Sequence, residues 1–217
     1  MRRPLRIVLL GPPGSGKGTQ AHIISELYGV PVITTGDMLR EAVANGTEYG
    51  KIVDSYMSRG ELVPDKIVNG VVGERLSRSD LGNGFILDGF PRSTPQAEFL
   101  DSFLEEHDLK LDYVIHVTLD DEAIVKRLSN RRSCPNCGEV YHLVSKPPKK
   151  EGICDKCGSE LILRDDDRPD VIRNRLVVYR EKTQPLLDRY MEKGLIKEVP
   201  GDNPIDRLPE LIKRVLG

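Results

Sequence analysis

The stretch GPPGSGKGT, residues 11–19, places glycines, one lysine and one threonine directly after the apolar run RIVLL. Glycines let a loop curl until successive backbone N–H groups point inward and hold an anion. A helix that begins there adds free N–H groups and the positive end of its dipole. The spacing Gly11-x4-Gly16-Lys17 therefore predicts a loop that binds nucleotide phosphates, with Lys17 as a point charge on the outer phosphates.

Position 18 departs from the usual form of such a loop. A serine or threonine commonly follows the lysine and holds Mg²⁺, but here Gly18 follows and Thr19 comes next. Asp88 ends a second apolar run, GFILD, and a carboxylate at the tip of a neighbouring strand can hold Mg²⁺ directly or through water. We therefore expect Asp88 to organise the metal. The alternative is an aspartate that only forms the turn before Gly89.

The cysteines predict a second metal site. All four lie in the two short motifs CPNC and CDKC, as Cys134, Cys137, Cys154 and Cys157. Two C-x2-C pairs at this separation are typical of zinc, and four thiolates fill a tetrahedral shell without an open position. We expect structural Zn²⁺, with iron in a rubredoxin-like site as the alternative. The segment has few apolar residues, so metal binding would supply much of its folding free energy.

Alternating apolar and amphipathic segments must position these residues. Apolar runs at 6–10, 84–88 and 112–120 predict buried parallel strands, and helical patterns lie between them. Thr35 or Asp37 is a candidate N-cap for the helix that follows the TTGD turn. We expect a helix over 120–132 and a long helix in the segment from 165 onward, opened by Pro169 and bent or broken at Pro185. The pattern predicts an α/β fold of the P-loop NTPase type, with a parallel sheet flanked by helices.

Composition narrows the function classes. The chain has 217 residues and a net charge of −2, which gives no general attraction to nucleic acid or anionic membranes. The apolar run near the N-terminus is too short for a signal peptide, and no stretch approaches the ~18 apolar residues of a membrane span. We therefore expect a cytoplasmic monomer whose partners are neither nucleic acid nor membrane.

Four motifs stand in order along the chain: GPPGSGKGTQ, TTGDMLR, LDGFPR followed by PQAE, and RDDD. Together they closely resemble the adenylate kinase family, over essentially the whole chain. The cysteine-bearing segment resembles the zinc-binding lid of many bacterial members. The resemblance implies a core of residues 1–33, 64–129 and 168–217. It also implies a nucleoside-monophosphate-binding segment at 34–63 and a lid at 130–167, both of which would move.

The resemblance also implies ligands for particular residues. The ATP phosphates would be bound by Gly14, Ser15, Gly16, Lys17, Gly18 and Thr19. AMP would be bound by Thr35, Arg40, Glu61, Leu62, Val63, Gly89, Phe90, Pro91, Arg92 and Gln96. Val140 and Tyr141 would cover the ATP base or ribose, and Arg131 would also contact ATP. The backbone of Asn203 would contact the ATP adenine. Arg164 and Arg175 would contact the AMP phosphate and the transition state.

The implied reaction needs charge and positioning, because the acceptor phosphate oxygen of AMP is already deprotonated and requires no general base. The catalytic set would be Lys17, Asp88, Arg92, Arg127, Arg131, Arg164 and Arg175, with Arg127 beside the transferring phosphoryl group. Asp165, Asp166 and Asp167 precede the helix opened by Pro169 and would compensate its dipole. They would also hold some of these arginines or form a hinge of the lid, and both kinds of role can apply together.

We expect an ATP:AMP phosphotransferase that converts ATP and AMP into two ADP with Mg²⁺. Thr35 favours AMP over a pyrimidine nucleotide, and the Gln96 amide can pair with an adenine edge. A UMP/CMP kinase, a GMP kinase or a GTP-using relative is the alternative within enzymes. A zinc-ribbon NTPase that binds nucleic acid is the alternative from another class, disfavoured by the acidic net charge.

Overall fold

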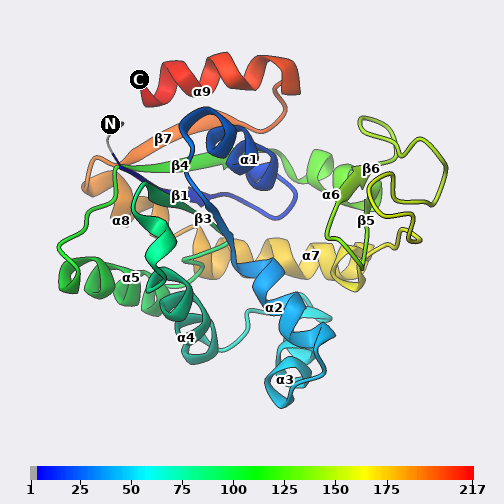
Figure 1. The fold of residues 1–217 in the computed structure, drawn as a ribbon, viewed down its shortest axis with the longest axis horizontal. Helices are drawn as coiled ribbons and strands as arrows, with labels where there is room; N and C mark the ends of the chain where they lie inside the picture. Colours follow the sequence, from blue (N-terminus) through cyan, green and yellow to red (C-terminus); the bar gives the residue numbers. More distant parts are fainter. Residues whose placement is uncertain (1–3) are drawn as a thin grey trace.

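Five parallel strands form the centre of the computed structural model, which describes residues 4–217 (Figure 1). They are β1 (Leu5–Leu10), β2 (Val32–Thr34), β3 (Gly84–Asp88), β4 (Tyr113–Thr118) and β7 (Ile196–Pro200). Their order across the sheet is β2-β3-β1-β4-β7, and every pairing is parallel. The predicted α/β class is confirmed. In such open sheets ligands bind beyond the carboxyl ends of the strands, where the strand order reverses.

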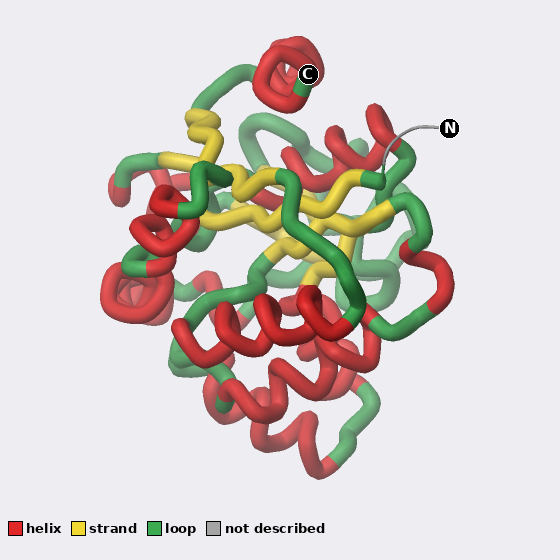
Figure 2. The backbone as a smooth tube through the Cα atoms, turned by 90° about the vertical axis from the view of Figure 1, so that its left-hand side faces the viewer, coloured by secondary structure: helices red, strands yellow, loops and turns green. Residues whose placement is uncertain are grey.

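Side chains of the strands alternate between two helical layers, which lie on opposite faces of the sheet (Figure 2). Ile7 and Leu9 join the apolar cluster that contains α1 (Lys17–Tyr28) and α9 (Leu208–Leu216). Val8 and Leu10 join the cluster that contains α4 (Asp65–Leu76), α5 (Thr94–Glu106) and α8 (Leu186–Glu192). Because both faces are covered, the strands read as continuous apolar runs in the sequence.

The remaining helices lie toward the carboxyl edge of the sheet. Helices α2 (Thr35–Ala44) and α3 (Glu48–Met57) form a pair that projects from the core (Figure 1). Helix α6 (Asp121–Ser129) packs on α7 (Pro169–Val178) through a separate small apolar cluster. The helix that starts at Pro169 is interrupted by a π-helical turn, Tyr179–Thr183, and resumes after Pro185 as α8. The predicted break at Pro185 is confirmed.

Residues 130–164 contain little regular structure. Strands β5 (Arg131–Ser133) and β6 (Val140–His142) pair antiparallel, and a 3₁₀ turn, Asp165–Asp167, leads back to α7. The buried members of the apolar cluster in this segment are Tyr141 and two of the cysteines. Five other apolar side chains of the segment are exposed: Val140, Leu143, Val144, Ile162 and Leu163. Among residues 4–217, no helix is long and apolar enough to cross a membrane.

Two predicted element boundaries were wrong. The helix predicted over 120–132 ends at Ser129, because residues 131–133 extend to pair with β6. The residue that caps α2 is Thr34, since both Thr35 and Asp37 already lie within the helix and Thr34 is still extended. The helix after the RDDD motif begins at Pro169, as predicted, because the fixed φ of proline suits a first helical position.

Candidate active site

The carboxyl edge of the sheet brings the predicted motifs together. The loop after β1 contains the glycines and leads into α1 at Lys17, as the sequence predicts. Asp88 is the last residue of β3, and Thr35 directly follows β2. Thr118 and Pro200 end the two strands on the other side of β1. All five strands therefore end around one site.

Lys17 folds back over its own loop. Its Nζ donates hydrogen bonds to the carbonyl oxygens of Gly11 and Pro12, at 2.8 Å each. Burial lowers the pKa of Lys17 to about 7; Asp88 opposes this shift, while Arg92 and other nearby arginines add to it. The loop thus contains a lysine that holds its proton weakly until an anion arrives beside it.

Gly18, which stands where a serine or threonine is usual, lies beside the carboxylate of Asp88. A Cβ atom at Gly18 would lie 3.4 Å from Oδ2 of Asp88, so a longer side chain there would extend into the space of this carboxylate. Asp88 is buried, and burial raises its pKa, whereas Lys17 and Arg92 lower it. An oxygen donor beside a phosphate-binding loop suits Mg²⁺, which takes its remaining ligands from phosphates and water. Asp88 therefore fits the metal role predicted for it.

Arginines from separate segments surround Lys17 and Asp88. Arg92, Arg131 and Arg175 lie close enough to Lys17 to lower its pKa. Arg40 in turn lowers the pKa values of Arg164 and Arg175. Burial is the main reason that the pKa values of Arg92 and Arg164 fall to about 10, and both remain protonated at neutral pH. So many cations in one place create a site for a highly charged anion.

Two aspartates of the RDDD motif hold these arginines. Asp167, whose side chain is fully buried, accepts from Nε and Nη2 of Arg131 at 2.7 and 2.6 Å. Arg175 pairs with Asp166 at 3.0 Å and with Asp167 at 3.3 Å. The prediction that this motif holds arginines is confirmed for Asp166 and Asp167, whereas the side chain of Asp165 is exposed.

Arg127 lies against the phosphate-binding loop, and its place beside the transferring group stays a prediction. Its Nη1 donates to the carbonyl oxygens of Gly14, Ser15 and Gly201, at 3.3, 3.2 and 3.1 Å. Gly201 is packed so closely that a Cβ atom there would lie 2.0 Å from the carbonyl oxygen of Ser15. Arg127 therefore ties the phosphate-binding loop to the loop after β7. Sequence alone did not indicate this, because the partner lies 74 residues away.

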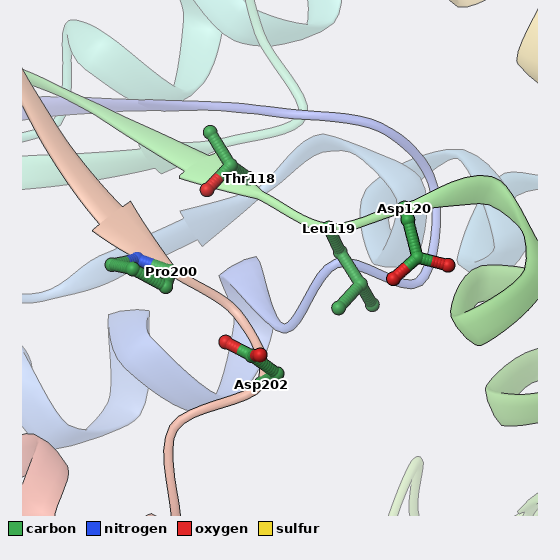
Figure 3. Close-up of a pocket in the computed structure, with 5 residues that line it drawn as sticks. All are labelled: Thr118, Leu119, Asp120, Pro200 and Asp202. Carbon is green, nitrogen blue, oxygen red and sulfur yellow. The ribbon is translucent and has the colours of Figure 1, made fainter.

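An open pocket of about 300 Å³ lies beside that junction, at the ends of β4 and β7 (Figure 3). Its lining residues are Thr118, Leu119, Asp120, Pro200 and Asp202. Asn203 follows this lining, and its side-chain amide donates to the carbonyl of Pro200 at 2.9 Å. The Asn203 side chain is thus occupied by the loop itself, which leaves the backbone as the part of this loop available to a ligand.

The residues predicted to bind AMP come from α2, from the loop before α4, and from the turn after β3 and the start of α5. Thr35 is buried, and its Oγ1 has no hydrogen-bond partner within residues 4–217, so it is free to bond a ligand. The side chains of Val63 and Phe90 are packed in the core, which leaves only their backbone for binding. Leu62 lies between Val63 and Glu61, and the Glu61 side chain is an exposed partner of Arg59. Gln96 is 1% exposed, and its amide is bonded to Arg92 and Asp65.

The turn that follows β3 holds Arg92. Gly89 adopts a φ of 84°, and a Cβ atom there would lie 2.7 Å from Nη2 of Arg92, so a side chain would displace the guanidinium. The peptide bond between Phe90 and Pro91 is cis. Nε of Arg92 donates to the Gly89 carbonyl at 2.8 Å, and the Arg92 carbonyl accepts from Oγ1 of Thr183 at 2.7 Å. Arg92 is thus fixed from both sides.

The four cysteines converge as predicted. Their Sγ atoms all lie within 4.8 Å of one another, with 3.3 Å between Cys134 and Cys157 and 3.6 Å between Cys137 and Cys154. These distances exceed an S–S bond of about 2.05 Å. They are close to the edge of a ZnS₄ tetrahedron, about 3.8 Å for a Zn–S bond of about 2.3 Å. The donor set therefore fits a tetrahedral metal such as zinc.

Tyr141 belongs to this cysteine cluster. It is 3% exposed, and its hydroxyl accepts from the N–H of Asp155 at 2.8 Å and contacts Sγ of Cys154 at 3.5 Å. Val140, in contrast, is exposed. Of these two residues predicted to cover the ATP base or ribose, Tyr141 has its side chain engaged by the segment itself.

Comparison with known proteins identifies the family. The family model described as "Adenylate kinase" matches residues 9–195. The chain belongs to the adenylate kinase family. An adenylate kinase of Archaeoglobus fulgidus is 53% identical over 98% of this chain and 98% of its own length. Adenylate kinases of Oceanobacillus iheyensis and Thermodesulfovibrio yellowstonii are each 52% identical over 98% of this chain and 99% of theirs.

Several residues that shape this adenylate kinase site were missed in the sequence. Asp65 bonds Gln96 and Ser93, Thr183 fixes Arg92, and Gly201 seats the loop after β7 on the phosphate-binding loop. None belongs to a short motif, and each acts across a long separation in sequence. Gly201 lies in the loop 200–204, which the sequence indicated as a contact of the ATP base, but its packing on the phosphate-binding loop had no local signal.

Proposed function

We propose that this protein catalyses the reversible, Mg²⁺-dependent transfer of the γ-phosphoryl group of ATP to AMP, giving two ADP. The observation that supports this proposal most directly is the cluster of Lys17 and arginines around Asp88, at the carboxyl edge of the sheet. An AMP phosphate oxygen forms the new bond to the γ-phosphorus. The bond between the γ-phosphorus and the bridging oxygen breaks, and its electron pair stays on the β-phosphate of ADP. No proton moves, which is consistent with a cluster of cations that needs no general base.

The residues divide this work by position. Residues 14–19 would bind the phosphates of ATP through backbone N–H groups, and Lys17 would neutralise the outer phosphates. Mg²⁺ bound near Asp88 would neutralise charge on the β- and γ-phosphate oxygens. Arg131, Arg164 and Arg175 would stabilise the equatorial oxygens as charge spreads over them, which for one arginine can be worth ~10³–10⁵ in rate.

The acceptor would lie between β3 and the α2–α3 pair. Arg40 and Arg92 would hold the AMP phosphate, and Thr35 would use its unpartnered Oγ1. The backbone at 61–63 and at Gly89, Phe90 and Pro91 would line the site, and Gln96 would read the base. The donor base would occupy the pocket at Thr118 and Asp202 (Figure 3), contacting the backbone near Asn203. Arg127 would position that pocket and would lie beside the transferring group.

Closure of two segments would follow from the charges. Arg40 comes from 34–63, Arg131 and Arg164 come from 130–167, and Arg92 comes from the core, so the cluster is assembled from three segments of one chain. Like charges repel unless anions lie between them, and the phosphates of both substrates would supply those anions. Closure would then exclude water and prevent hydrolysis of ATP. The cysteine cluster would hold Zn²⁺ and keep the lid folded.

Product stoichiometry tests this function. We expect two ADP to appear for each ATP consumed with AMP and Mg²⁺, and ATP and AMP to appear when ADP alone is supplied. Lys17→Met should abolish both directions while leaving the fold intact. ADP formation that needs no AMP would contradict the proposal, because it would mean transfer to water.

A further inference from the structure

Gln96 has an amide whose orientation is set by its neighbours. Its Oε1 accepts a hydrogen bond from the backbone N–H of Arg92 at 2.8 Å. Its Nε2 donates to Oδ1 of Asp65 at 2.7 Å. Only 1% of Gln96 is exposed, so water does not compete for either bond.

The two partners exclude the flipped amide for a chemical reason. A backbone N–H can only donate, and an ionised carboxylate can only accept. A flipped Gln96 would place two donors together at Arg92 and two acceptors together at Asp65. Of the four bonding positions of the amide, these bonds use two, which leaves one acceptor position on Oε1 and one donor position on Nε2.

Asp65 is itself fixed in place. Ser93 Oγ donates to the same carboxylate oxygen at 2.7 Å. Asp65 is also the first residue of α4, where a negative charge is stabilised by the helix dipole. Its position is therefore set chiefly by the start of α4 and not by Gln96 alone.

A fixed amide distinguishes purines by the substituent at C6. Adenine presents an amino donor at C6 and an acceptor at N1, whereas hypoxanthine and guanine present an acceptor at C6 and a donor at N1. When the ribose and phosphate of the nucleotide are already held, the C6 substituent and N1 of the base can face the Gln96 amide in only one order. An amide locked in the orientation seen here pairs with one of the two patterns and opposes the other.

We propose that Asp65 is a specificity-determining positioning residue, which locks the Gln96 amide so that the acceptor site selects 6-amino over 6-oxo purine nucleotides. This inference rests on the proposed function, because it takes Gln96 as the residue that reads the base of AMP. Asp65 does not touch the base and acts through Gln96.

The test compares AMP with inosine 5′-monophosphate, which differ only at C6 and N1. The ratio of kcat/KM for the two acceptors is measured in the wild type and in Asp65→Asn. An asparagine can present either its oxygen or its nitrogen to Gln96. In this variant a flipped Gln96 amide would keep a bond to residue 65 and would lose only the bond to the N–H of Arg92. We expect the ratio to fall by about tenfold, the effect of losing one hydrogen bond to a charged group.

Two further variants separate positioning from stability. In a Gln96→Ala background, Asp65→Asn should leave the ratio unchanged, because a residue that acts through Gln96 has nothing left to orient. Ser93→Ala removes the cap of α5 but keeps the bond between Asp65 and Gln96. It should lower Tm and leave the ratio as in the wild type.

Each outcome decides between the claims. If the wild type transfers to AMP and Asp65→Asn keeps the ratio, Asp65 is only structural and the inference is wrong, while the proposed function stands. If the wild type transfers to neither acceptor, the proposed function fails first. If Asp65→Asn does not fold, wild-type calorimetry with AMP, inosine 5′-monophosphate and purine riboside 5′-monophosphate decides. Similar affinities for the first two would overturn the inference, and weakest binding of the 6-oxo nucleotide would support it.

Discussion

Replacing Asp167 by asparagine removes the charge that Arg131 and Arg175 share. Asp167 Oδ2 accepts from Nε of Arg131 at 2.7 Å, and Oδ1 accepts from Nη2 of Arg131 at 2.6 Å and from Nη1 of Arg175 at 3.3 Å. The Asp167 side chain is 0% exposed, whereas that of Arg131 is 21% exposed. Arg175 keeps Asp166 as a second partner. Arg131 is therefore the residue left without its counter-ion.

The magnitude follows from this geometry. Breaking a buried ion pair by removing one partner costs ~3–5 kcal/mol of unfolding free energy. Asparagine retains one acceptor oxygen and Arg131 reaches some solvent, so we expect the lower end, about 3 kcal/mol. In a chain of this size each kcal/mol shifts Tm by about 2–4 °C, which gives a fall of ~6–12 °C.

Scanning calorimetry without nucleotides measures the loss of stability, and the same scan with ATP and AMP measures how far the nucleotides restore it. The phosphates should replace the lost anion, so the nucleotides should raise Tm more in Asp167→Asn than in the wild type. Turnover should fall, because Arg131 is no longer held. Asp165→Asn, at an exposed neighbour, is the matched control and should change stability by less than about 0.5 kcal/mol. A Tm within about 2 °C of the wild type for Asp167→Asn, or an equal loss in the control, would refute the reasoning.

Three further predictions concern other parts of the site. Burial lowers the Lys17 pKa to about 7, and a bound phosphate raises it, so ATP binding near pH 8 should take up a proton. Calorimetry in buffers of different ionisation enthalpy should show this proton uptake in the wild type and not in Lys17→Met. Equal heats of binding in all buffers would count against it. Gly201→Ala places a Cβ atom 2.0 Å from a backbone oxygen of the phosphate-binding loop, so ATP affinity should fall at least about tenfold with AMP affinity unchanged. Gly70→Ala, with nothing within 4 Å, should instead stabilise α4 by about 0.5–1 kcal/mol, and an equal loss of ATP affinity in both variants would contradict the close packing. Elemental analysis should find one Zn²⁺ per chain. Removing the zinc should expose residues 143–152 to proteolysis, while the far-UV circular dichroism spectrum should still show the folded sheet. A lid that resists proteolysis equally well without metal would exclude this role.

Much of the core could be predicted because its signals are local. Continuous apolar runs identify strands that are buried on both faces, and the glycine spacing after β1 identifies the phosphate-binding loop. The cysteine pairs likewise carry their own geometry, since each C-x2-C turn places two thiolates together. These features depend on residues that are close in sequence.

The errors and omissions share a different cause. Arg127 lies one helical turn before Arg131 in sequence, but its direction is decided by carbonyls at 14, 15 and 201. The bond between Asp65 and Gln96 spans 31 residues, and that between Thr183 and Arg92 spans 91. Such contacts depend on how the elements pack, which no local pattern encodes. The motif RDDD is intermediate, because its charges indicated arginine partners without indicating which ones.

The most direct test of the central claim is transfer of a labelled γ-phosphate from Mg·ATP to AMP, UMP, CMP, GMP and water, measured side by side. The site described here predicts strong transfer to AMP, weak transfer to the other nucleotides and almost none to water. Preferred transfer to another nucleotide would preserve the phosphate-binding machinery but contradict the roles given to Thr35 and Gln96. Release of label to water without transfer to AMP would contradict the phosphotransferase account itself.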